Sequence, residues 1–154
     1  MTDTTSGPVQ HTNLFHTGIV VDDLAAAKAE LGERLGVTWT EGGADVALIT
    51  DDGIQVVPSA YAMSREGPHH VELAQAVPGT IWTVPEPGHA HHLGYWVDSV
   101  TEASAALTAS GVPRVATVAI TEDAPPMCAY HRTTNGLYVE VVSRALRRVL
   151  LPDS

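Results

Sequence analysis

The chain has 154 residues, with 18 acidic and 8 basic side chains, a formal net charge of −10 and a single cysteine. This length suits one domain or two small modules that share a core. The negative charge argues against a nucleic-acid partner, the lone cysteine excludes an internal disulfide framework or a thiolate zinc site, and no apolar run is long enough to span a bilayer.

The first half is expected to form a βαβββ module over residues 13–75. It follows a polar stretch, residues 1–12, which we expect to be a flexible lead-in because it lacks the basic and apolar regions of a signal peptide. A cytoplasmic location is therefore expected. Asp52-Gly53 predicts a hairpin turn, and Gly36 is placed to end a helix. The expected elements are a strand at 14–21, a helix at 24–35 and strands at 45–50, 54–59 and 69–75.

A connector at residues 76–90 contains three prolines and shows no periodicity, which favours a linker or lid over regular structure. A second βαβββ module is expected over residues 91–143, followed by a C-terminal tail at 144–154. Ser99 and Glu102 form a capping-box pattern at the start of the module's helix. The expected elements are a strand at 92–97, a helix at 100–110 and strands at 113–120, 127–134 and 137–143.

The two modules repeat each other in sequence. When "FHTGIVVDDL" (15–24) is laid over "HHLGYWVDSV" (91–100), His16 matches His92 and Gly18 matches Gly94. The last strands match through "VEL" and "VEV", so that Glu72 corresponds to Glu140. An internal duplication is therefore the main organisational feature of the chain.

Each module has one histidine on its first strand and one glutamate on its last: His16, Glu72, His92 and Glu140. Taken singly, each would be interpreted as an ordinary core or surface residue. A buried, unpaired carboxylate is costly, however, and two neutral imidazoles with two carboxylates suit a divalent ion such as Ni, Zn, Co, Mn or Fe(II). Their repeat-related positions predict a metal site. By contrast, His69, His89 and His91 are expected in loops or on the opposite face.

The paired modules, with strands "HTGIVV", "HLGYWV", "VELAQ" and "LYVEVV", resemble the vicinal oxygen chelate superfamily, which includes glyoxalase I, methylmalonyl-CoA epimerase, extradiol dioxygenases and bleomycin-resistance proteins. The resemblance covers residues 13–143. It implies an α+β fold in which two tandem βαβββ modules form an open barrel around the metal. It also implies that His16, Glu72, His92 and Glu140 occupy the four ligand positions.

The set His, Glu, His, Glu is similar to that of glyoxalase I. The resemblance thus implies a metal-dependent lyase or isomerase, epimerases included, that chelates two vicinal oxygens and transfers a proton through an enediolate. Glu72 and Glu140 are the candidates for the base, and the choice between them is open. A non-catalytic drug- or metabolite-binding protein is the alternative. An extradiol-type dioxygenase is a further alternative, disfavoured by Glu72 at the fourth position.

The scarcity of basic residues favours a small substrate that is uncharged or aromatic. The candidate pocket residues are His70, Trp82, Trp96, His131 and Tyr138, although core packing is an alternative for the aromatic ones. The modules could pair within one chain or between two, so a homodimer is an expected assembly. Neither a nucleic-acid nor a membrane partner is expected.

Overall fold

The computed structural model describes residues 7–84 and 89–154. Residues 1–6 of the expected flexible lead-in and residues 85–88 of the expected connector lie outside the described residues. The remainder of the lead-in ends in a short 3-10 turn, η1 (His11–Asn13), directly before the first strand.

Each module has the predicted order of one strand, one helix and three strands. The elements of the first are β1 (Leu14–Val21), α1 (Leu24–Leu35), β2 (Trp39–Thr50), β3 (Gly53–Ser64) and β4 (His70–Gln75). Those of the second are β5 (His92–Val97), α2 (Val100–Ala109), β6 (Arg114–Ala119), β7 (Cys128–Arg132) and β8 (Tyr138–Ser143). The tail forms η2 (Arg144–Leu146) and α3 (Arg147–Leu150).

The eight strands form one closed barrel in the order β1-β4-β3-β2-β6-β7-β8-β5. Each module supplies four neighbouring strands, and the modules join through the antiparallel pairs β1–β5 and β2–β6. The α+β fold of two tandem modules is confirmed, but the barrel expected to be open is closed. Both joints lie within one chain, so the barrel needs no second copy to close.

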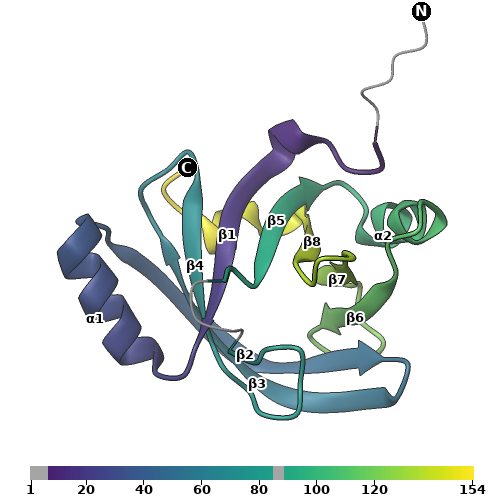
Figure 1. The fold of residues 1–154 in the computed structure, drawn as a ribbon, viewed down its shortest axis with the longest axis horizontal. Coiled ribbons are helices and arrows are strands. Elements are labelled where there is room, and N and C mark those ends of the chain that lie inside the picture. Colours follow the sequence, from purple (N-terminus) through teal and green to yellow (C-terminus); the bar gives the residue numbers. More distant parts are fainter. Residues whose placement is uncertain (1–6, 85–88) are drawn as a thin grey trace, which may run out of the picture.

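Helices α1 and α2 lie outside the ring of strands, on opposite sides of it (Figure 1). Asp23 caps α1 by accepting a hydrogen bond from the Ala26 backbone N–H at 2.9 Å, and the Ser99 hydroxyl caps α2 in the same way. Helix α2 packs Val100 and Leu107 against the outer face of β7 and β8. The interior of the barrel holds the larger apolar cluster, which surrounds the candidate site.

The hairpin between β2 and β3 differs from the prediction. Its turn lies at Asp51 and Asp52, because Thr50 pairs with Gly53, which opens β3 with a positive φ of 127°. Both strands run 12 residues, longer than predicted. The additional part of β2 contains polar residues and Gly42-Gly43, which are poor strand formers, and pairing with β3 overrides this weak local preference.

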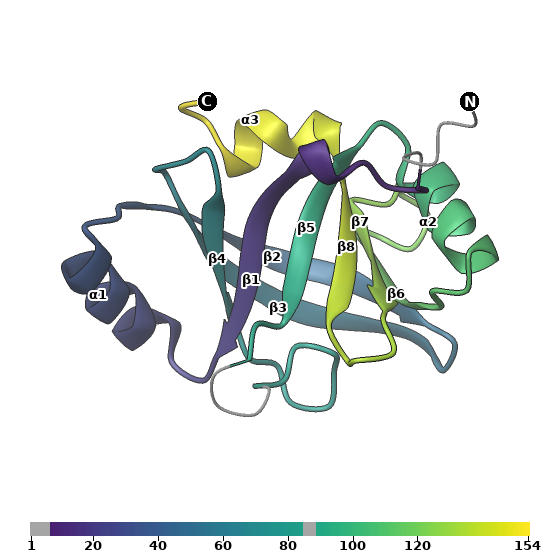
Figure 2. The same ribbon diagram turned by 45° about the horizontal axis from the view of Figure 1, so that its top comes forward.

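The C-terminal segment η2–α3 lies across one end of the barrel, and residues 76–84 of the connector lie at the other end (Figure 2). Within this segment, Leu151 is buried and packs into the core cluster, whereas Arg147 and Arg148 are exposed. Among the described residues, no helix is long and apolar enough to cross a membrane.

Candidate metal centre

The four repeat-related polar residues lie on adjacent strands of the ring, in the order β4, β1, β5 and β8. The strand register places Gly18 between Glu72 and His92, and Gly94 between His16 and Glu140. Each histidine is therefore separated from a glutamate by one glycine on the strand between them. In both pairs the histidine and the glutamate belong to different modules. The duplication brings four residues distant in sequence to one place.

The glycines make this convergence possible. A Cβ at Gly18 would lie 1.9 Å from Cε1 of His92, and a Cβ at Gly94 would lie 1.9 Å from Cε1 of His16. Any larger residue at either position would occupy the space of the opposing imidazole. The pattern His-x-Gly at the start of each module is thus a reciprocal packing device, a role that the sequence comparison did not assign to the matched glycines.

The donor atoms of three residues converge on one point. Nε2 of His16 lies 3.0 Å from Nε2 of His92, and Oε2 of Glu140 lies 3.1 Å and 3.2 Å from these two nitrogens. Glu72 lies slightly farther out, with its oxygens 3.3 Å from His92 Nε2 and 4.0 Å from His16 Nε2. His16, His92 and Glu140 form the compact cluster, and Glu72 stands at its edge.

This donor set fits a divalent cation. An ion about 2.0–2.2 Å from nitrogen and oxygen ligands places neighbouring donors about 3 Å apart, which is the spacing seen here. Oε2 of Glu140 is buried, and within the described part of the chain it has no hydrogen-bond partner despite its two close nitrogens. An ion placed between the three donor atoms would supply the partner that Oε2 of Glu140 lacks. Two carboxylates also balance the charge of a divalent ion.

Without a cation, the cluster must hold a proton. Burial alone would lower the pKa of His92, but Glu140 and Glu72 raise it to about 10. Burial alone would raise the pKa of Glu140, but His92 and His16 hold it well below its usual range. The metal-free centre therefore contains an imidazolium between carboxylates, and a cation at the same point must displace that proton.

His91 also belongs to this region, although it was expected on the opposite face. Its side chain is buried, with Nδ1 2.8 Å from Nδ1 of His92 and Nε2 2.7 Å from the carbonyl oxygen of Ile81. Burial, together with the neighbouring His92, lowers the pKa of His91 to about 4. Strand alternation failed here because His91 precedes the first residue of β5 and is not held to the pleat.

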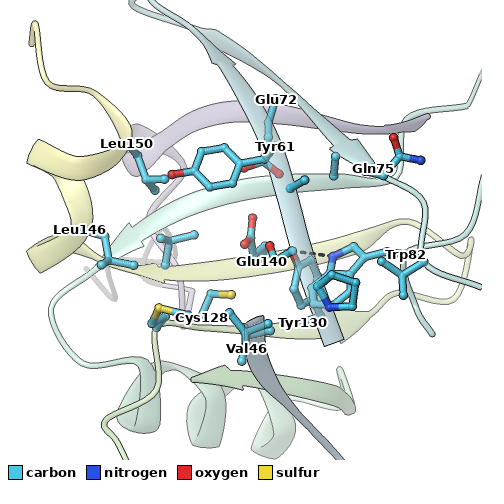
Figure 3. Close-up of a pocket in the computed structure, with 18 of the residues that line it drawn as sticks. Val46, Tyr61, Glu72, Gln75, Trp82, Cys128, Tyr130, Glu140, Leu146 and Leu150 are labelled. Atoms are coloured by element: carbon cyan, nitrogen blue, oxygen red, sulfur yellow. Dashed lines mark hydrogen bonds between the residues drawn. The ribbon is translucent and has the colours of Figure 1, made fainter. Parts of the chain in front are cut away.

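A cavity of about 150 Å³ adjoins the carboxylates. Glu72 and Glu140 enter it, with Trp82 on one side and Leu146 and Leu150 of the C-terminal segment on the other (Figure 3). Most of the remaining wall is apolar, and no lysine or arginine lines it among the described residues. The Trp82 indole N–H donates to the Tyr130 hydroxyl at 3.3 Å, which fixes both rings in the wall.

Four of the five candidate pocket residues lie elsewhere, within the described part of the chain. His131 faces α2, where its imidazole bonds the Ser104 hydroxyl and the Val112 carbonyl oxygen. His70 bonds the Ser64 carbonyl oxygen at 2.7 Å. Trp96 stacks on Phe15 with ring centroids 3.7 Å apart.

The fourth of these residues, Tyr138, packs beside His91 with ring centroids 4.9 Å apart. Only Trp82 has the expected place in the cavity wall. Sequence reasoning missed Tyr130 and the leucines of the tail. The apolar spacing of Leu146, Val149 and Leu150 in the tail was an available signal for a packed helix face.

Comparison with known proteins supports this architecture. A family model described as Glyoxalase/Bleomycin resistance protein/Dioxygenase superfamily matches residues 15–128. No curated protein matches the chain significantly.

Several solved structures share the fold. Methylmalonyl-CoA epimerase from Mycobacterium tuberculosis superposes with a TM-score of 0.58 at 22% identity, covering 93% of this chain and 92% of that one. A hypothetical protein from Bacillus halodurans superposes with a TM-score of 0.57 at 17% identity, covering 85% of this chain and 93% of that one. A variant of Streptomyces coelicolor methylmalonyl-CoA epimerase in complex with 2-nitronate-propionyl-CoA superposes with a TM-score of 0.59 at 16% identity. The match covers 86% of this chain and 97% of that one.

Proposed function

This chain belongs to the Glyoxalase/Bleomycin resistance protein/Dioxygenase superfamily, and from that premise we propose that it is a metal-dependent lyase or isomerase of glyoxalase type. The reaction is a proton transfer on a small substrate that carries two adjacent oxygens; epimerisation is one form of it. The observation that carries the proposal is the convergence of His16, His92 and Glu140 at 3.0–3.2 Å, with Glu72 beside them.

His16, His92, Glu140 and Glu72 would hold the divalent ion. When bound, such an ion acts as a Lewis acid on vicinal oxygens and stabilises the negative charge that develops as a carbon-bound proton leaves. The protein residues position the donors, keep bulk water from them and move the proton.

Glu72 is the better candidate for the base. Glu140 lies within 3.2 Å of both imidazoles and is buried, so its carboxylate is held in place. Glu72 lies 3.3 Å from Nε2 of His92 and 4.0 Å from Nε2 of His16, its side chain is 12% exposed, and it lines the cavity. A carboxylate that is less tightly held and adjoins the substrate space can accept a proton from carbon and return it. We assign proton transfer to Glu72, which also lies among the ligands, and ligand binding alone to Glu140.

The cavity favours a small, uncharged and largely apolar or aromatic substrate. Trp82, Tyr130 and the leucines of the C-terminal segment offer apolar contact, while Glu72 and Glu140 give the wall its negative charge. A phosphate- or carboxylate-bearing substrate would meet these carboxylates without a basic partner from the described lining residues. Small α-hydroxy ketones, aliphatic or aryl, are therefore suitable probes.

Metal content is the first test. Tag-free wild-type protein should contain one divalent ion per chain, and His92→Ala and Glu140→Ala should lose it while remaining folded. Protein that binds an apolar ligand without any metal dependence would support the alternative of a binding protein and overturn the proposal.

Proton transfer is the second test. Metal-loaded protein in D₂O should exchange the carbon-bound proton of acetoin or α-hydroxyacetophenone, as followed by NMR, and Glu72→Gln should abolish the exchange. Oxygen uptake on catechols without such exchange would indicate the dioxygenase alternative instead.

A further inference from the structure

We propose that His91 is a positioning residue for the metal centre: bonded to the carbonyl oxygen of Ile81, it holds His92 in the tautomer whose Nε2 is free to bind the ion. The inference rests on the proposed function and extends it to a residue outside the four repeat-related ligands.

The tautomer follows from the chemistry of the hydrogen bonds. A carbonyl oxygen only accepts, so Nε2 of His91, 2.7 Å from the Ile81 oxygen, must carry the proton. The other nitrogen of a neutral imidazole is then an acceptor. Across the 2.8 Å contact between the two Nδ1 atoms, His92 must be the donor. A neutral His92 protonated at Nδ1 has its lone pair on Nε2, the atom that faces His16 and Glu140.

The fold holds His91 rigidly enough for this role. Its backbone N–H donates to the Gly18 carbonyl oxygen at 2.9 Å, and its carbonyl oxygen accepts from the Tyr138 N–H at 3.1 Å. The Tyr138 ring packs against the imidazole. Ile81 is positioned by a connector turn in which the Val77 N–H donates to the Trp82 carbonyl oxygen at 2.8 Å. The connector therefore contributes directly to the centre.

The first module supplies an internal comparison. Phe15 occupies the repeat position of His91, so His16 has a phenyl ring where His92 has an imidazole. Nδ1 of His16 is buried and has no hydrogen-bond partner within the described part of the chain. One ligand histidine is thus oriented by a hydrogen bond and the other by packing alone. Hydrogen-bond partners of ligand histidines fix ring orientation and tautomer in metal sites generally.

Three variants separate hydrogen bonding from packing. His91→Phe reproduces the arrangement of the first module and removes the acceptor. His91→Asn places an amide oxygen near the position of Nδ1 and restores the acceptor. His131→Phe is the matched control, because it removes another buried imidazole bonded to a backbone carbonyl, on the α2 side of the sheet.

The measurement is the zinc dissociation constant, obtained by competition with a chromophoric chelator, with thermal unfolding as a check on folding. His91→Phe should bind zinc about 10–100-fold more weakly than wild type, as for loss of a hydrogen-bond partner of a ligand histidine. His91→Asn should recover most of the affinity, and His131→Phe should bind as wild type does. Wild-type affinity in His91→Phe would overturn the proposal, as would equal losses in the Phe and Asn variants.

Nitrogen NMR of histidine-labelled, metal-free protein gives a second readout. The spectrum should show His91 protonated at Nε2 alone and His92 protonated at Nδ1. A His91 protonated at Nδ1 would overturn the inference even if zinc binds. If wild-type protein binds no divalent ion, the proposed function fails, while the spectrum still decides the hydrogen-bond assignment.

Discussion

Replacement of Gly94 by alanine is expected to displace His16 and weaken divalent-metal binding severely. The new Cβ would lie 1.9 Å from Cε1 of His16, where ordinary contact begins at 3.4 Å. The imidazole must therefore retreat by about 1.5 Å, whereas metal–ligand bonds tolerate about 0.2 Å. Gly18→Ala should act equally on His92, whose Cε1 is at the same distance.

The loss of zinc affinity should exceed the roughly 10–100-fold loss that follows when a ligand loses its hydrogen-bond partner, because here the ligand itself is displaced. Crowding of the buried site should also lower the free energy of unfolding by about 1–3 kcal/mol. Gly32→Ala is the control, since its Cβ would meet atoms no closer than 3.4 Å inside α1. It should stabilise the protein by about 0.5–1 kcal/mol.

Chelator competition gives the zinc dissociation constant, and thermal unfolding shows whether each variant folds. A folded Gly94→Ala protein that binds zinc with wild-type affinity would refute the proposed role of Gly94. Equal effects of the Gly94 and Gly32 substitutions would refute it as well.

Three further predictions concern the proton, the glutamates and the cavity. Because the pKa of His92 is raised to about 10, its stabilising charge in metal-free protein is fully present below pH about 6.5 and lost as pH rises through 10. Zinc binding at pH 8 should accordingly release about one proton, measurable by calorimetry in buffers of different ionisation enthalpy, and no release would contradict the assignment. Glu72→Gln should lower deuterium exchange by about 10²–10⁴-fold with zinc retained, whereas Glu140→Gln should lose zinc; the reverse pattern would exchange their roles. Trp82→Ala should lower the free energy of unfolding by about 3–5 kcal/mol in denaturant titrations, and an unchanged value would place the indole outside the packed wall.

The fold could be predicted because its information is local and duplicated. Strand 14–21 and helix 24–35 agree with β1 and α1 residue for residue, and the cap at Ser99 was readable from residue type. The closed barrel could not be predicted, because it depends on the pairings β1–β5 and β2–β6 between distant strands. The local sequence of a strand does not indicate whether its edge pairs with a strand of the other module.

The candidate site was predictable only to the extent that the repeat encodes it. Matching His16 to His92 and Glu72 to Glu140 identified four residues that the register places together. His91 was misplaced because strand parity does not extend to the residue before a strand. His131 was misplaced because sequence cannot show which face of β7 meets a helix; the structure turns it toward Ser104.

Diffraction data from zinc-soaked crystals, collected at the zinc absorption edge, would test the central claim most directly. We predict one strong anomalous peak within about 2.0–2.2 Å of Nε2 of His16, Nε2 of His92 and Oε2 of Glu140. Zinc found only on the surface, with these three side chains still within 3.0–3.2 Å of one another, would contradict the account.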